Sequence, residues 1–247
     1  MAQPDPSVVK NLAPTGTLRV GLNMSNFLLT RTESDGSPAG VAPDLGRELG
    51  RRLGVPVQLV PFANPGLLAD AAKTGVWDVG FLGAEPQRAN EIDFTPAYVE
   101  IEATYLVPPG SKITSVEQVD RDGIRIAVPD RAAYELYLTR NIKHAQLIRE
   151  KGADNAFKRF VADKLDALAG LRPRLVDDHA KLAGSRILDG RFTAVQQAAG
   201  APKGRSAAAV QYLCEFIEDV KASGLVAKTI ENNNVVGLTV AGASGPR

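Results

Sequence analysis

The sequence has few of the residues that form disulfides or bind metals. It contains one cysteine, Cys214, and two histidines, His144 and His179, in 247 residues. A disulfide framework needs paired cysteines, and a structural zinc site usually takes four ligands, mostly cysteine and histidine. We therefore expect no disulfide, no bound metal and no cofactor.

An excess of positive charge is missing as well. The chain has 29 Lys+Arg against 28 Asp+Glu, which gives a formal net charge of +1. Binding to nucleic acid or to an anionic lipid surface depends on an excess of basic side chains. This balance argues against a nucleic-acid partner.

Long apolar runs and the usual catalytic motifs are also absent. No segment reaches the roughly 20 consecutive apolar residues that span a bilayer, and the first six residues lack the basic and apolar regions of a secretory signal. We expect a chain that is cytoplasmic or supplied without its leader. No GxSxG elbow, P-loop or GxGxxG motif occurs, so a hydrolase, an NTPase and a dinucleotide-binding enzyme lose their usual support.

The residues that are present give a globular composition with an alternating pattern. Hydrophobic residues make up 44% of the chain and charged residues 23%, which suits one large domain or two modest ones. Short β-branched segments alternate with longer amphipathic ones, an order typical of βαβ units in an α/β protein. The first half predicts strands at 18–23, 57–60 and 78–82, a helix carrying Leu45, Leu49 and Leu53 that ends at Gly54, and a helix at 65–73.

The second half repeats this order after a break at Pro108-Pro109-Gly110. It predicts strands at 124–128, 146–149, 166–169 and 192–198, and helices at 132–140, 154–162 and 173–182. Two further helices follow, a long one with Val210, Leu213, Cys214 and Ile217 on one face and a shorter one near 225–230. Residues 241–247 are small and polar and are expected to fray.

Four short phrases follow one another in the first half of the chain, and the resemblance that they carry extends over about residues 16–240. They read GTLRVG (16–21), PAGVAPDL (38–45), GVWDVG (75–80) and RANEIDFTPAY (88–98). Each phrase is weak by itself, but together they resemble the family-3 extracellular solute-binding proteins of bacterial amino-acid ABC importers. The last phrase is similar to the family's run of an arginine, an acidic residue, Phe-Ser/Thr and a Pro-Tyr pair.

The resemblance implies an α/β fold of the two-lobed, type II periplasmic-binding-protein kind. Each lobe would be a mainly parallel sheet flanked by helices, and two crossing strands would form a hinge. Lobe 1 would comprise residues 1–106 and 199–247, and lobe 2, inserted in lobe 1, residues 107–198. The implied protein is a periplasmic monomer that is not an enzyme, binds a small carboxylate-bearing solute by closing its lobes and delivers it to a membrane ABC permease.

The resemblance makes Arg88 the residue that binds the carboxylate of the ligand in lobe 1. A guanidinium offers two donors in a plane that matches a carboxylate, and it stays charged at any working pH. The alternative is a surface arginine that pairs with Glu91 or caps a helix.

The segment before Arg88 departs from the family's pattern. The family usually has a Ser/Thr-rich loop there, whereas this chain has Gly83-Ala84-Glu85-Pro86-Gln87, about two residues shorter by motif comparison. Backbone amides from Gly83 onwards must then carry more of the recognition. Glu85 either holds an amine of the ligand or orients Arg88.

A second departure follows the Asp166-Ala167 strand. Relatives that bind α-amino acids typically carry an aspartate shortly after it, whereas this chain has Gly170-Leu171-Arg172. Arg172 would suit a second anionic group, so the ligand is either an acid without an amine or an amino acid whose ammonium is held elsewhere. The other interpretation is that Arg172 is a solvated residue at a helix start before Pro173.

The remaining binding candidates follow predicted strands, because ligands of open α/β sheets lie beyond the carboxyl ends of strands. Asn26 and Phe27 follow the first strand and Phe62 the second, and the aromatic rings pack either on the ligand or in the core. Arg131 and Ala132 follow the first strand of lobe 2, where Asp130 is expected to cap the helix.

Two other classes of protein remain open alternatives. The same fold resembles the periplasmic cyclohexadienyl dehydratases, and such a lyase needs a general acid, which Glu85 or Asp130 would have to supply. A ligand-sensing receptor domain is also compatible with the fold.

Overall fold

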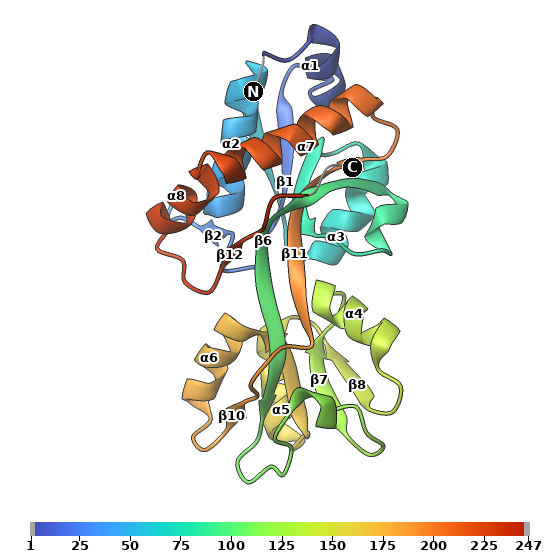
Figure 1. The fold of residues 1–247 in the computed structure, drawn as a ribbon, viewed down its shortest axis with the longest axis vertical. Helices are drawn as coiled ribbons and strands as arrows, with labels where there is room; N and C mark the ends of the chain where they lie inside the picture. The colour runs from blue at the N-terminus through green and yellow to red at the C-terminus, as the bar shows by residue number, and fades with distance from the viewer. Residues whose placement is uncertain (1–2, 245–247) are drawn as a thin grey trace. The chain divides into compact units, whose positions relative to one another are not determined.

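The structure is a computed structural model that describes residues 3–244. The chain forms two compact units: unit 1 contains the described parts of Met1–Glu100 and Gln196–Arg247, and unit 2 contains Ile101–Val195. Two strands, β6 (Ile92–Val107) and β11 (Thr193–Pro202), run from one unit into the other (Figure 1). The predicted lobe limits, after residues 106 and 198, fall within these two strands.

Unit 1 is built on a sheet with the strand order β4-β1-β5-β11-β6. β4 (Val57–Phe62) and β5 (Val79–Gly83) are parallel to β1 (Leu18–Asn23), whereas β11 is antiparallel to β5 and β12 (Thr239–Val240) is antiparallel to β6. The register places Asn23 opposite Phe62 and Leu22 opposite Phe81. β1, β4 and β5 therefore end at the same edge of the sheet.

Helices cover both faces of this sheet. They are α1 (Pro6–Leu12), α2 (Val41–Leu53), α3 (Pro65–Asp70), α7 (Ala207–Ala222) and α8 (Leu225–Asn232), with short turns η1 (Ala71–Thr74) and η2 (Arg88–Asn90) and a hairpin of β2 (Arg31–Thr32) and β3 (Pro38–Ala39). A Cβ added at Gly46 of α2 would lie 2.9 Å from Val20, and one added at Gly21 would lie 2.5 Å from Leu68 of α3. Since successive strand residues point to opposite faces, α2 and α3 pack on opposite sides of β1.

The helix α2 forms where the leucine spacing predicts it. Leu45, Leu49 and Leu53 are all buried, because residues four apart lie on one face of a helix. Gly54 ends the helix in a left-handed conformation, with φ at 70°, which a glycine adopts without steric cost.

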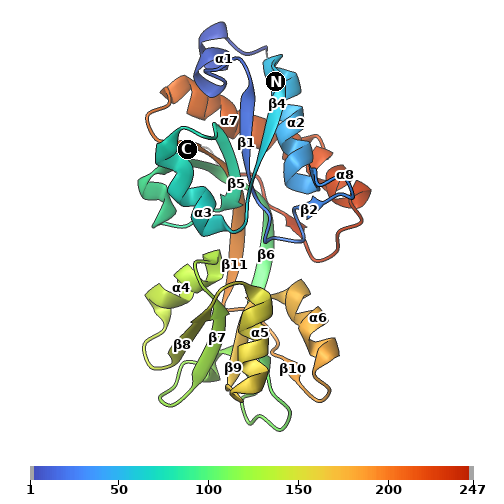
Figure 2. The same cartoon turned by 180° about the vertical axis from the view of Figure 1, so that it is seen from behind.

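Unit 2 is built on a second mixed set of strands in the order β6-β9-β7-β8. β7 (Arg125–Pro129) is parallel to β8 (Gln146–Glu150) and β9 (Ala167–Leu171), while β9 and the short β10 (Arg186–Ile187) are antiparallel to β6. Its helices are α4 (Ala133–Asn141), α5 (Ala153–Ala162) and α6 (Arg172–Lys181), preceded by the turn η3 (Val116–Gln118). Figure 2 shows α5 lying along β7 and β9.

Two apolar clusters pack on the opposite faces of the unit 2 sheet. Ile126 and Val128 belong to one cluster with Tyr105, whereas Ala127 belongs to the other with Phe160. This division follows from the period of two along a strand, which sends every second side chain of β7 to the same face.

The predicted α/β class is confirmed, and each predicted strand and helix is present within a few residues of its predicted limits. The predicted helix at 65–73 is correct only in part, because α3 ends at Asp70 and the chain continues as the tighter turn η1. The sequence did not predict α1, the two-residue strands β2, β3, β10 and β12, the short turns η2 and η3, or the full length of β6, which spans 16 residues.

The predicted apolar face of α7 is partly wrong. Leu213 and Ile217 are buried, but Val210 and Cys214 are only partly buried, and Tyr212 and Phe216 complete the buried face. The face is rotated because the aromatic side chains bury more area than valine and cysteine would.

The predicted fraying of residues 241–247 stays a prediction, although the described part of this segment makes contacts with α7. Gly242 accepts a hydrogen bond from Lys221 Nζ at 2.9 Å, and Ser244 Oγ donates to Glu218 Oε1 at 2.8 Å. These polar contacts join residues 242 and 244 to α7, and residues 245–247 lie outside the described part. Among residues 3–244, no helix is both long and apolar enough to cross a membrane.

Candidate functional site

The carboxyl ends of the parallel strands form the candidate site in each unit. In unit 1, β1, β4 and β5 end at Asn23, Phe62 and Gly83. The helix α3 begins just after β4, with Asn64 Oδ1 accepting a hydrogen bond from Leu67 N at 3.0 Å. Strand ends and helix starts bring free backbone amides together, an arrangement that suits an anionic group.

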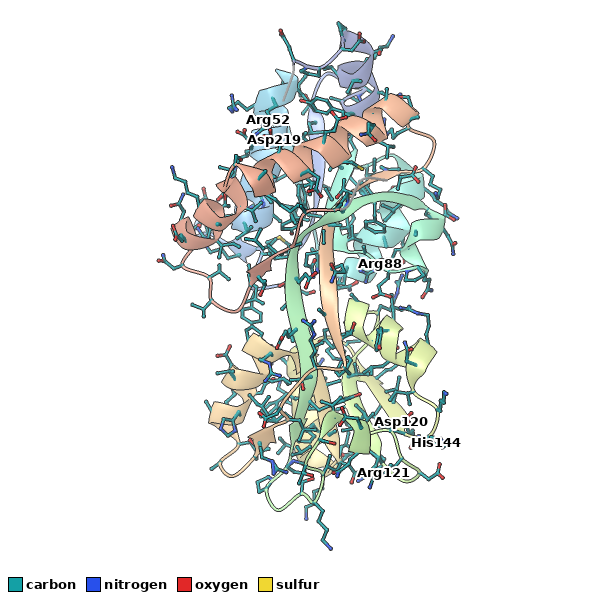
Figure 3. All side chains as sticks on the ribbon, viewed as in Figure 1. Arg52, Arg88, Asp120, Arg121, His144 and Asp219 are labelled. Atoms are coloured by element: carbon teal, nitrogen blue, oxygen red, sulfur yellow. The ribbon has the colours of Figure 1, made fainter. Side chains whose placement is uncertain are left out.

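Arg88 lies at this edge of unit 1, where Figure 3 labels it. Its side chain is 5% exposed, and its Nη1 donates to the carbonyl of Gly83 at 2.7 Å. The carbonyl of Glu85 accepts from the amides of Arg88 and Ala89, at 2.9 and 3.0 Å. The short loop that precedes Arg88 therefore turns tightly and brings the guanidinium back against the end of β5.

The same loop is tied to the neighbouring strand. The amide of Ala84 donates to the carbonyl of Gln196 in β11 at 2.8 Å, so Gly83 and Ala84 continue the pairing of β5 with β11. Because the backbone is fixed on both sides, the position of Arg88 is set before any ligand binds. Glu85 is partly buried in this loop.

Asn26 belongs to a compact turn after β1. Its Oδ1 accepts from the amide of Leu28 at 3.3 Å, and Thr30 Oγ1 donates to the carbonyls of Asn23 and Asn26 at 2.8 and 3.0 Å. Phe27, within this turn, is 47% exposed. The turn is thus rigid at its base and presents an aromatic ring at its tip.

The two aromatic candidates of unit 1 differ in environment. Phe62 is partly buried and packs against the cluster of Leu68, Trp77 and Leu82, so its ring serves the core at least in part. The exposed ring of Phe27 has no such packing in that cluster. That either ring contacts a ligand stays a prediction.

In unit 2, β7, β8 and β9 end at one edge. Asp130 N donates to the carbonyl of Glu150 at 2.8 Å, which extends the pairing of β7 with β8. Arg131 follows with φ at 59°, in the left-handed region. Arg131 and Ala132 therefore lie at the carboxyl end of β7, as the sequence predicts, and their contact with a ligand stays a prediction.

The predicted role of Asp130 as a helix cap is wrong. The residue that caps α4 is Ala132, two positions later, and no side chain caps this helix end. The helix begins late because Glu135 Oε2 accepts the amide of Arg131 at 3.1 Å, which keeps that residue out of the first turn.

Arg172 is engaged inside unit 2. Its Nε donates to Glu102 Oε2 at 2.9 Å, and its Nη2 donates to the carbonyl of Gly190. Arg191 Nη1 lies 3.6 Å from the other oxygen of Glu102. Arg172 does begin α6, directly before Pro173, as the second interpretation has it, but its side chain is hydrogen-bonded to the protein and is not merely solvated. Binding of an anion by Arg172 stays a prediction, and it requires the guanidinium to be shared with these partners.

The contact between His179 and Ser185 does not make a nucleophile. His179 Nδ1 lies 2.9 Å from Ser185 Oγ, but Ser185 Oγ donates its proton to the carbonyl of Leu182 at 2.6 Å. The histidine must then act as the donor, which is the reverse of a general base that activates a serine. Over residues 3–244, no group of three or more His, Cys, Asp or Glu side chains could hold a metal ion.

Tyr98, the last residue of the phrase that begins at Arg88, packs against β5. It is fully buried, and its ring meets that of Phe81 in β5 edge to face, with centroids 5.7 Å apart. Burial raises the pKa of its hydroxyl above the ordinary range. Tyr98 therefore serves as a buried support for the middle of β5.

These strand orders and strand-end edges define the class of type II periplasmic binding proteins. The sequence profile of the bacterial extracellular solute-binding proteins, family 3, matches residues 18–233, and the chain belongs to this family. No functionally curated protein is significantly similar to it in sequence.

Solved structures share the fold at low sequence identity. An ancestral amino-acid-binding protein, a precursor of cyclohexadienyl dehydratase, has a TM-score of 0.74 at 23% identity over 91% of this chain and 98% of its own. An amino acid ABC transporter substrate-binding protein from Streptococcus pneumoniae, bound to L-arginine, has a TM-score of 0.72 at 20% identity over 95% and 99%. An ancestral arginine-binding protein bound to arginine has 0.72 at 22% over 88% and 98%.

Proposed function

We propose that this solute-binding protein captures a small carboxylate-bearing solute, an amino acid or a related organic acid, by closing its two units around it. Arg88 is the observation that carries the proposal. A nearly buried guanidinium at the carboxyl ends of parallel strands, beside helix starts, is suited to a planar anionic group. Asn26, Phe27, Phe62, Gly83 and Glu85 complete the proposed unit 1 surface.

The proposed contacts of unit 2 come from Arg131, Ala132 and Arg172. A ligand that binds both units favours the closed arrangement by its differential affinity for that state. Similarity to proteins bound to arginine supports an amino acid as the solute. Glu85 is the candidate partner for its ammonium in unit 1.

We further propose a periplasmic monomer that delivers its solute to a membrane ABC permease and does not act as an enzyme. Family membership supports an extracellular location, and the relative from Streptococcus pneumoniae belongs to an amino acid ABC transporter. A lyase would need a general acid positioned in an enclosed site, and Asp130, one of the two candidate acids, is exposed to solvent.

The proposal is tested with a thermal-shift panel on protein stripped of bound solute by unfolding and refolding. The panel contains the twenty amino acids and matched organic acids without an amine, and hits are measured by calorimetry. At about 100 times Kd, a ligand that binds only the folded state raises the free energy of unfolding by about 2.7 kcal/mol.

Stabilisation by one or a few carboxylates supports the proposal, and the split between amino acids and amine-free acids identifies the ligand class. Stabilisation by none of the compounds overturns it. Turnover of prephenate or arogenate by the pure protein would contradict the non-enzymatic part alone.

A further inference from the structure

A buried glutamate lies behind the loop that joins β7 to α4. Glu135, in the first turn of α4, is only 3% exposed. Its Oε1 accepts from Thr139 Oγ1 at 2.6 Å and from Arg149 Nε at 2.8 Å, and its Oε2 accepts from the amide of Arg131 at 3.1 Å. Burying a carboxylate is costly, so the presence of these donors is what makes the position tolerable.

Two elements fix the orientation of this carboxylate. Thr139 lies one turn further along α4, and Arg149 comes from β8, which lies next to α4 in both views (Figures 1 and 2). Arg149 Nη2 also donates to Thr139 Oγ1 at 2.9 Å, so Glu135, Thr139 and Arg149 form a closed ring of hydrogen bonds. The ring holds Oε1 and leaves Oε2 directed at the loop.

The loop residue that Glu135 holds has an unusual backbone. Arg131 has φ at 59°, and within residues 3–244 the other non-glycine residues with positive φ are Lys164 and Asn234. Those two follow the ends of α5 and α8, where a left-handed residue commonly terminates a helix. Arg131 instead follows a strand and precedes a helix, so helix termination does not account for its conformation.

We propose that Glu135 is a positioning residue for the ligand-binding loop of unit 2. Its carboxylate holds the amide of Arg131, keeps the backbone left-handed, and so presents Arg131 and Ala132 at the carboxyl end of β7. Glu135 acts through the loop and does not touch the ligand. The inference rests on the proposed function, which places Arg131 and Ala132 in the binding surface.

The first test needs no ligand. In Glu135→Gln the acceptor is neutral and weaker, so the amide of Arg131 should exchange its hydrogen about tenfold faster than in the wild type, measured by NMR on folded protein. Thr139→Val removes one donor of the ring from an exposed position. It should also speed hydrogen exchange at the amide of Arg131, by a smaller factor. Unchanged exchange at Arg131 in both folded variants overturns the proposal.

The second test measures affinity in two backgrounds. The probe is L-arginine, replaced by the panel compound with the largest thermal shift if L-arginine gives none. Glu135→Gln should weaken binding about tenfold in the wild-type background. In Arg131→Gly the left-handed backbone costs nothing, so adding Glu135→Gln to that variant should change its affinity by about twofold or less.

The control is Lys164→Gly, which relaxes the other non-glycine residue of unit 2 with a left-handed backbone and should leave affinity unchanged. Equal losses from Glu135→Gln in both backgrounds would show a general structural role and overturn the proposal. If no panel compound binds the wild type, the proposed function fails, and the exchange measurement still decides whether Glu135 holds the loop.

Discussion

Three arginines of this chain have the same chemistry and different uses. Arg88 donates to a backbone carbonyl at a strand end, and Arg172 pairs with Glu102. Arg19 binds the fully buried carboxylate of Asp78 with Nε and Nη2, at 2.9 and 2.8 Å. Each role is set by the acceptor that the fold brings to the guanidinium, so residue type alone does not distinguish them.

Arg88 carries the first prediction at this scale. Arg88→Lys keeps the charge but loses the planar pair of donors, so affinity for the panel ligand should fall at least about tenfold. Arg88→Ala loses both the charge and the donors, so affinity should fall at least about a hundredfold. Isothermal calorimetry measures the loss. Arg47→Ala is the matched control, because Arg47 is half exposed and pairs with Asp44 on α2. Equal affinity of Arg88→Ala and Arg47→Ala would remove Arg88 from the site.

Glu48 carries a prediction about acid stability. Hydrogen bonds from Arg51 and Arg52 lower the pKa of Glu48 from 4.5 to about 2, and Arg52 also binds Asp219 of α7, as Figure 3 shows. A carboxyl group whose pKa is lower in the folded protein than in the unfolded chain stabilises the folded protein. This stabilisation is fully present at pH values above the pKa of the unfolded chain. This stabilisation is lost as the pH falls from about 4.5 towards 2.

Glu48→Gln should therefore lower the free energy of unfolding by about 1 kcal/mol at pH 7 and flatten its decline in acid. Urea unfolding at a series of pH values measures both effects. Glu33→Gln, which removes a carboxylate that is 45% exposed, should change stability by less than about 0.5 kcal/mol. If the free energy of unfolding of Glu48→Gln falls in acid as steeply as that of the wild type, Glu48 is not the source of this pH dependence.

At the scale of elements, glycines allow helix α2 to approach the sheet. A Cβ at Gly50 would lie 2.1 Å from Val57 Cγ2 and 3.2 Å from the carbonyl of Val55. The close approach brings Leu45, Leu49 and Leu53 into the core of unit 1. A glycine inside a helix has low helix propensity, and here its packing explains it.

Gly50→Ala should destabilise the protein by about 1 kcal/mol, because overpacking costs about 1–3 kcal/mol and alanine regains up to about 1 kcal/mol of helix propensity. In a Val57→Ala background the 2.1 Å contact is removed and only the one with the Val55 carbonyl remains, so the same change should cost clearly less. Chemical denaturation of the four proteins gives the coupling. A Gly50→Ala cost that is the same in both backgrounds would mean that Val57 is not the obstacle.

At the scale of the whole molecule, the chain forms two units with their own cores, joined by β6 and β11. Two units joined by a small number of chain segments are the arrangement in which hinge closure around a ligand occurs. The proposed function uses this property, since a ligand held by both units shifts the population towards a closed state.

Saturating ligand should therefore reduce the radius of gyration in small-angle X-ray scattering. Arg88→Ala at the same ligand concentration should keep the ligand-free value, because the population moves only as far as the differential affinity allows. An unchanged radius of gyration in a wild-type protein shown by calorimetry to be saturated would contradict closure.

The α/β class, the order of its strands and helices and the position of Arg88 after β5 followed from the sequence. They did so because periodicity and glycine stops act locally, as in α2, where residues four apart share a face. The family resemblance rested on the same local phrases, and the match over residues 18–233 confirmed it.

Contacts between distant segments were decided only by the tertiary structure. β12 forms because residues 239–240 pair with β6. α4 starts after Ala132, where Glu135 accepts a hydrogen bond from the amide of Arg131. The partners of Arg172, Glu102 and the carbonyl of Gly190, are likewise distant in sequence. Such hydrogen bonds depend on which strand ends the fold brings together, and no local pattern encodes that proximity.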